Sequence, residues 1–193
     1  MRMMGLFLAT LAWGCTQKGH NHATGSAQRT YVLAGATIQP PRDTGWALLT
    51  SDSVEATFQR HSANATARIS ARTFAIERSA DDQAFLTGAE ARQQEAVTPF
   101  LMMSIHFNHT HLHGATCVRY DGIFRDTFAI GLEREFLTTK GYLCRHPTDP
   151  LRALQMELTQ RSDSSTPLDM EQTLAVAQAF FDRAAFVRDS PAP

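Results

Sequence analysis

The sequence lacks the motifs of several enzyme classes, and it lacks any hydrophobic run long enough to span a bilayer. No apolar stretch among its 193 residues approaches the roughly 20 residues that a transmembrane helix needs. It contains no G-x-S-x-G, H-E-x-x-H, P-loop or G-x-G-x-x-G pattern, and no C-x-x-C pair. Because it lacks a recognisable nucleophile–base pair, the sequence favours a protein that is not an enzyme, without deciding the question.

An excess of charge of one sign is also missing. The net charge is −1 and charged residues make up 19% of the chain, so nothing points to a nucleic acid partner. The hydrophobic content of 43% is ordinary for a globular protein, and the length suits one domain with a substantial core.

The first fifteen residues, MRMMGLFLATLAWGC, set the expected location. One cationic residue, Arg2, precedes an apolar run that ends in Leu-Ala-Trp-Gly-Cys. This ending resembles the lipobox of bacterial lipoproteins, which implies a signal peptide over 1–14 and a lipidated Cys15. The alternatives are a buried N-terminal helix and a misassigned start codon. Polar residues over 15–30 read as a flexible tether that begins at Cys15, and Thr16, rather than Asp, after the cysteine favours the outer membrane over the inner.

The cysteine count agrees with an envelope location. Once Cys15 carries lipid, Cys117 and Cys144 remain as an even pair, and in an oxidising compartment such a pair indicates a disulfide. The chain-entropy model gives this cross-link about 3–3.5 kcal/mol of stabilisation. The alternative is two free buried thiols in a cytosolic protein.

Hydrophobic periodicity predicts one α+β domain over 31–188, followed by a disordered tail over 189–193. Alternation of apolar and polar residues indicates antiparallel strands, and two segments have helical patterns with capping residues. The expected strands include 54–60, 65–76, 101–112, 115–121, 136–147 and 151–162, and the expected helices are 79–98 and 166–186. We therefore predict an antiparallel sheet of about six or seven strands packed by two main helices.

Some details of these elements are also predicted. Ser79 is the expected cap of the first helix, with Phe85, Leu86 and Ala89 as its apolar stripe. For the second helix the expected cap is Thr166, with Pro167 at the first helical position.

The segment FNHTHLHG (107–114) places His109, His111 and His113 at alternate positions of a predicted strand. Alternate residues share a face, so two of these imidazoles plus an outside ligand could hold zinc. The odd-numbered residues Leu101, Met103, Ile105 and Phe107 form the core-facing side of this strand, and the three histidines have the same parity. We therefore expect the strand to run beyond the core after Phe107, or a bulge there to turn the following side chains to the other face. A solvated hairpin tip that turns at 113–114 is the favoured interpretation, and a metal site is the alternative.

A second constellation lies in CVRYDGIFRD and GYLCRHP, residues 117–126 and 141–147. It resembles a family of uncharacterised proteobacterial envelope proteins and lipoproteins with C-V-R-Y and G-x-x-C-x-H-P motifs. The matching residues are Cys117, Val118, Arg119, Tyr120, Gly141, Cys144, His146 and Pro147, followed by Gln160, Arg161 and Ser162. The resemblance implies a disulfide-bearing envelope domain and no known activity. The order of elements is also similar to PsbP/Mog1-like domains, a fold-level analogy.

Within these motifs we identify a candidate binding cluster of Arg119, Tyr120, Asp121 and His146. The alternative is that these residues serve only strand-edge hydrogen bonding and ordinary turn chemistry. The resulting prediction is a non-catalytic, lipid-anchored envelope protein that faces the periplasm and acts as a binding or accessory factor. Its expected partners are the membrane and an unknown envelope protein or small-molecule ligand, with no cofactor. The alternatives are a metal-binding protein or metal-assisted hydrolase that uses zinc at the 109–113 histidines, and a purely structural surface-interaction module.

Overall fold

A computed structural model describes residues 29–126, 136–164 and 169–187. The predicted signal peptide (1–14), the predicted tether (15–30) up to residue 28, and the predicted tail (189–193) lie outside these ranges. Among the described residues, no helix is both long and apolar enough to cross a membrane.

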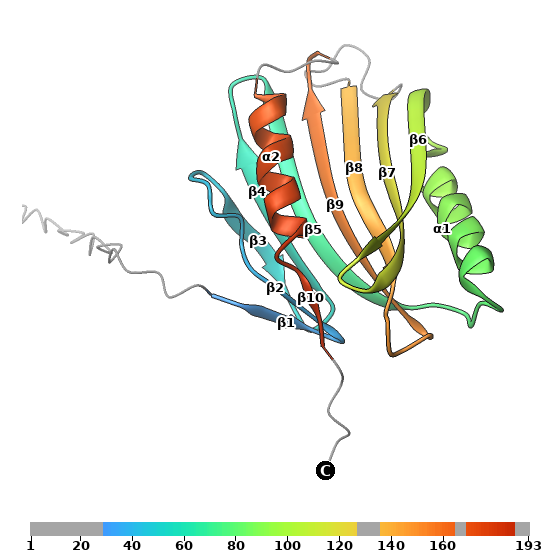
Figure 1. Ribbon diagram of the computed structural model, residues 1–193. Coiled ribbons are helices and arrows are strands. Elements are labelled where there is room, and N and C mark those ends of the chain that lie inside the picture. The colour runs from blue at the N-terminus through green and yellow to red at the C-terminus, as the bar shows by residue number, and fades with distance from the viewer. Residues whose placement is uncertain (1–28, 127–135, 165–168, 188–193) are drawn as a thin grey trace, which may run out of the picture.

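A seven-stranded antiparallel sheet forms the centre of the domain (Figure 1), with strand order β3-β4-β5-β9-β8-β7-β6. Its strands are listed here in that order: β3 (Ala47–Ser51), β4 (Glu55–His61), β5 (Ala65–Ala75), β9 (Arg152–Ser162), β8 (Phe136–Arg145), β7 (Ala115–Arg125) and β6 (Leu101–Leu112). The prediction of an antiparallel α+β sheet with two helices is confirmed.

A second, three-stranded sheet was not predicted. It consists of β1 (Tyr31–Leu33), β2 (Ala36–Ile38) and β10 (Ala185–Phe186), in the order β1-β2-β10. Gly35, with φ of 81°, makes the turn between β1 and β2. Strands of two or three residues leave too little periodicity to be recognised in a sequence.

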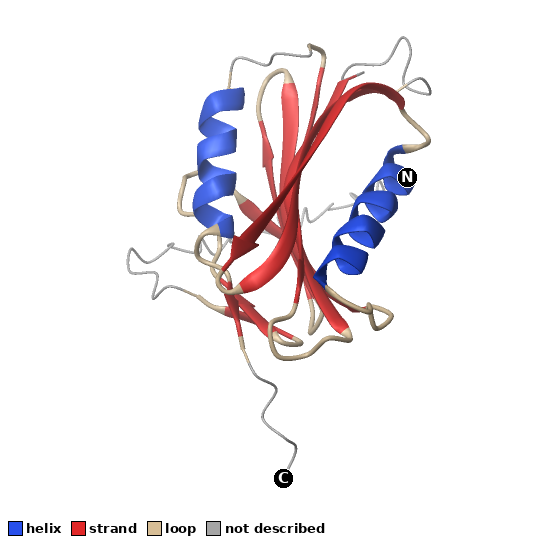
Figure 2. Ribbon diagram, turned by 45° about the vertical axis from the view of Figure 1, so that its right-hand side comes forward, coloured by secondary structure: helices blue, strands red, loops and turns tan. Residues whose placement is uncertain are grey.

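The helices α1 (Asp82–Val97) and α2 (Met170–Phe181) lie on opposite sides of the large sheet, as Figure 2 shows. The buried residues of α2 and of the small sheet pack with Cys117 and Cys144, whereas those of α1 pack with Val118 and Leu143. Adjacent residues of β7 and β8 therefore enter different cores, because successive side chains of a strand point to opposite faces.

The ends of both helices differ from the prediction. The N-cap of α1 is Asp81, not Ser79, and its side chain accepts a hydrogen bond of 2.8 Å from the backbone N–H of Ala84. Asp81 competes well for this role because its carboxylate also complements the helix dipole. Helix α2 begins at Met170, and the predicted cap, Thr166, lies outside the described residues.

The predicted course of β6 needs correction in one respect. Its bulge falls between Met102 and Ser104, before Phe107 rather than after it. Leu101 and Met103, expected in the core, are each 55% exposed. Strand β6 is the edge of the sheet, and the bulge at Met103 leaves Leu101, the partner of Arg125, on the α2 side. Beyond Phe107 the register stays regular. The strand therefore continues past the core, which was the first of the two expectations for this segment.

Candidate functional site

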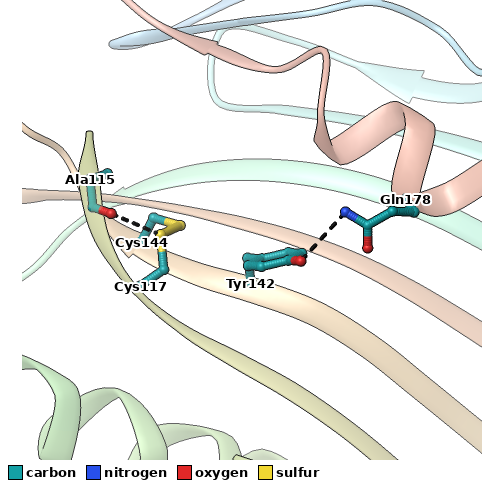
Figure 3. The surroundings of a disulfide bond; sticks show 5 residues. All are labelled: Ala115, Cys117, Tyr142, Cys144 and Gln178. Carbon is teal, nitrogen blue, oxygen red and sulfur yellow. Dashed lines mark hydrogen bonds between the residues drawn. A yellow bond between two sulfur atoms is a disulfide. The ribbon is translucent and has the colours of Figure 1, made fainter. Parts of the chain in front are cut away.

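The predicted disulfide between Cys117 and Cys144 is present and joins directly paired residues of β7 and β8. Both cysteines are fully buried beneath α2. Figure 3 shows the bridge on the same side of the sheet as Tyr142, whose hydroxyl accepts a 3.4 Å hydrogen bond from Gln178 of α2. The bridge thus belongs to the larger core and is far from solvent, which gives it a structural role.

The predicted binding cluster is not brought together. Tyr120 points to the α1 side of the sheet, whereas its neighbours Arg119 and Asp121 follow the parity of Cys117 and point to the α2 side. His146 lies elsewhere again, 5% exposed, where its Nδ1 accepts from the backbone N–H of Asp149 at 3.0 Å. Its Nε2 then carries the proton, within 3.0 Å of the carbonyl oxygen of Gly35. This histidine therefore ties the end of β8 to the small sheet.

Two of the β6 histidines, His109 and His111, lie on the α1 side of the sheet, whereas His106 lies on the α2 side. His109 Nε2 lies 2.7 Å from Glu90 Oε1. The pKa of Asp82 is lowered by a hydrogen bond from Thr116 and by the charges of Arg145 and His111. His113 sits in the predicted hairpin turn with φ of 51°, followed by Gly114 with φ of 80°. In the described part of the chain, no three His, Cys, Asp or Glu side chains are placed to hold a metal. Metal binding stays a prediction from the sequence.

The structure reveals a different candidate site, which we call the polar sheet face. It comprises the outward side chains of β4, β5 and β9 on the α1 side, four from each strand, aligned by the strand register. Its members are Glu55, Thr57, Gln59, His61, Thr66, Arg68, Ser70, Arg72, Gln155, Glu157, Thr159 and Arg161. Helix α1 packs on β6 and β7, and within the described ranges no helix covers these three strands on this side.

A cavity of about 360 Å³ lies where the polar sheet face meets the C-terminal half of α1. A second hollow of about 310 Å³ lies at the other end of the face, around His61, Arg68 and Arg161. The two hollows share Thr159 as a lining residue and therefore adjoin along the sheet. Cavities of this size, lined by a few convergent polar groups, are typical of small-molecule sites.

Tyr120 and Glu157 form the hydrogen-bonded centre of the first cavity. The Tyr120 hydroxyl donates to Glu157 Oε2 at 2.6 Å and accepts from Gln155 Nε2 at 3.1 Å. Burial raises the pKa of the Tyr120 phenol, and the adjacent Glu157 carboxyl raises it further. Burial also raises the pKa of Glu157, although the Tyr120 hydrogen bond opposes that shift. Both groups therefore favour their protonated forms more than they would in water.

Gly141 makes room for this pair. It is the register partner of Tyr120 on β8, and a Cβ there would lie 2.3 Å from the Met156 carbonyl oxygen and 2.7 Å from the Tyr120 hydroxyl. The tyrosine ring can cross the neighbouring strand because residue 141 has no side chain. This close approach gives a physical reason for the tyrosine and the glycine that the sequence motifs contain.

Sequence reasoning missed Glu157, Arg72 and Gln93 as site residues. The alternation that predicts β5 and β9 does place polar side chains on one face of each strand. That these faces join depends on the pairing of β5 with β9, across more than 80 residues of chain, as the 3.0 Å bond from Arg72 to Gln155 illustrates. Nothing in the local pattern reports such a register.

The fold and site thus define an α+β domain with an open, polar sheet face bordered by one helix. No family model and no curated protein matches the chain. Among solved structures, LpqN of Mycobacterium tuberculosis, described as involved in cell envelope biogenesis, is similar with a TM-score of 0.51 and 14% identity, over 85% of this chain and 87% of that one. A Pseudomonas aeruginosa protein of unknown function gives a TM-score of 0.48 and 16% identity, over 86% and 99%. At these identities the first similarity concerns the fold alone.

Proposed function

We propose that the protein is a non-catalytic, lipid-anchored factor of the bacterial cell envelope, and that the polar sheet face is its binding surface. The observation that carries the binding role is the pair of adjoining hollows along that face, the first of which holds the bonded pair Tyr120 and Glu157. An ordinary solvated face holds its polar groups in water. This one removes a tyrosine and a carboxyl from water beside a cavity, a costly arrangement that suits recognition of a ligand.

Three observations support the envelope location. The residues before Cys15 resemble a lipobox, and the buried Cys117–Cys144 bridge suits an oxidising compartment. LpqN, which shares the fold, is described as involved in envelope biogenesis. In this proposal, acyl chains on Cys15 anchor the protein to the membrane, and the domain faces the periplasm.

The anchor is tested by metabolic labelling of the full chain with palmitate. We expect the wild-type protein to incorporate label and to sediment with membranes, and Cys15→Ser to do neither. Thr16→Ala is the matched control, because it alters the adjacent residue and keeps the acceptor sulfur, and it should label as the wild type does. An unlabelled wild-type protein contradicts the anchor.

The binding surface is tested with the full-length protein in phospholipid nanodiscs, carrying ¹³C-labelled threonine methyl groups. Thr66 and Thr159 report on the polar sheet face, and Thr37 in the small sheet reports on the opposite side. We expect a water-soluble or lipid extract of the envelope to shift the first two signals and leave Thr37 in place. If neither extract moves Thr66 or Thr159, the polar sheet face is not a binding surface.

A further inference from the structure

The cavity at the end of α1 has two walls of different chemistry. One wall is apolar and comes from the last turns of α1, the segment after it and the sheet beneath: Ala96, Val97, Phe100, Ile105 and Leu137. The other wall is polar and comes from the polar sheet face together with Tyr120 and Thr139. A ligand that fills the space must therefore be amphipathic, with hydrocarbon against the helix and a polar head over β5 and β9.

Gln93 indicates what that head must offer. This side chain continues the buried stripe of α1, where apolar residues precede it, and it is only 5% exposed. Its Nε2 is buried and makes no hydrogen bond of normal length in the described structure, and the residue lines the cavity. The nearby Tyr120 hydroxyl, whose pKa burial raises and the Gln93 amide lowers, already donates to Glu157 and accepts from Gln155. Buried polar groups in proteins are nearly always bonded, so an acceptor is missing at this point. An oxygen acceptor on a ligand would supply it.

The charges around the cavity argue against an ionised head. Arg72 contributes one positive charge, while Glu55 and Glu157 contribute two carboxyl groups. Arg72 faces both carboxyl groups, because Glu55 is its register partner and its charge acts on Glu157, so its positive charge is already offset by groups of the protein. A cationic head would in turn leave the Gln93 donor without an acceptor. An uncharged carbonyl satisfies Gln93 without repulsion from either carboxyl group.

We infer that this cavity binds a small amphiphile with an alkyl chain and an uncharged carbonyl head, of the kind found in amides and esters. The inference rests on the proposed role of the polar sheet face and adds the class of ligand. The alkyl chain lies against Val97 and Ile105, and the carbonyl oxygen accepts a hydrogen bond from Gln93 Nε2.

The test uses three probes with the same six-carbon chain: hexanamide, hexanoate and hexylamine. The full-length protein in nanodiscs carries ¹³C-labelled isoleucine methyl groups, so Ile105 reports on the cavity and the fully buried Ile69 on the opposite face. Partition of each probe into empty nanodiscs corrects its free concentration. We expect hexanamide to shift Ile105 in a saturable way and both charged probes to bind at least fivefold more weakly. Equal or tighter binding of either charged probe overturns the inference.

Gln93→Met removes the donor and keeps the length of the side chain. Loss of one hydrogen bond to an uncharged acceptor corresponds to about fivefold to tenfold weaker binding of hexanamide. Arg68→Ala, at the other end of the polar sheet face and outside this cavity, should leave hexanamide binding unchanged. If Gln93→Met binds hexanamide as well as the wild type does, the buried amide has a purely structural role and the inference is wrong.

The two proposals fail separately. Suppose that envelope extract shifts the Thr66 and Thr159 signals and that hexanamide does not shift Ile105. The polar sheet face then remains a binding surface, and the proposed class of ligand is wrong. Extract without effect on either threonine contradicts the proposed function itself.

Discussion

Reduction of the Cys117–Cys144 bridge should cost the protein a large part of its free energy of unfolding. The bridge closes a loop with a sequence separation of 27. In the chain-entropy model, a loop of this length lowers the entropy of the unfolded chain enough to stabilise the fold by about 3.5 kcal/mol. Small domains unfold at a total of about 5–15 kcal/mol, so the loss is large.

The assay is urea unfolding of the full chain, oxidised and reduced, followed by far-UV circular dichroism. With a urea m value of about 2 kcal/mol/M, the loss corresponds to a midpoint lower by about 1.8 M in the reduced protein. The folded states of the two forms differ little, because the cysteines face each other as register partners with Cα atoms 4.1 Å apart. We therefore also expect a larger m value after reduction, since the unfolded chain becomes more extended.

Cys117→Ala combined with Cys144→Ala separates the cross-link from core packing. Both cysteines are 0% exposed, so this variant loses the buried sulfur atoms as well and should be less stable than the reduced wild-type protein. A midpoint that moves by less than about 0.5 M on reduction, with an unchanged m value, would refute the assignment of the stability to the unfolded state.

Four further substitutions test the site, helix α1 and the hairpin. Glu157→Gln should gain stability relative to the wild type as the pH rises above 4.5, because burial raises the folded-state pKa of this carboxyl and its ionisation destabilises the fold. Urea unfolding of both proteins between pH 4 and 8 measures the difference in their free energies of unfolding. A difference that does not change with pH contradicts the prediction. In thermal unfolding, Gly141→Ala should destabilise the protein by about 2–3 kcal/mol, because the added Cβ must displace the Tyr120 ring. Gly88→Ala should stabilise it by about 0.5–1 kcal/mol in the same assay, because a Cβ at this helical position meets nothing within 4 Å. His113→Asn should stabilise by a few tenths of a kcal/mol, up to about 1, because a two-residue turn with positive φ at both positions favours Asn-Gly; a lower melting temperature would exclude that turn type.

The sequence predicts most of the large sheet because its central strands are long and strictly alternating. In β5, Ala67, Ile69 and Ala71 are buried and Arg68 is exposed, as the pattern indicates. The same logic fails at Leu101, which is exposed. Its neighbours in the sequence are apolar, but whether a strand is central or at an edge depends on the order of strands and not on local composition.

The site was harder to predict than the fold. The candidate cluster joined Arg119, Tyr120 and Asp121 as polar residues around the disulfide, yet consecutive residues of a strand point to opposite faces. The partner of Tyr120 is instead Glu157, which lies 37 positions away in the chain. Only the register of β7 with β8 and of β8 with β9 brings these two side chains together.

The burial of adjacent residues on both faces of β7, β8 and β9 has a consequence for the motions of the domain. Cys117 and Val118, or Ala153 and Leu154, are buried in cores on opposite sides of one strand. Backbone amides in these strands can exchange with deuterium only when both cores separate, at close to the full free energy of unfolding. Every residue of β3 is exposed, so this edge can open alone. The polar sheet face therefore runs from a rigid strand, β9, towards a margin that can separate from the sheet while the rest stays folded.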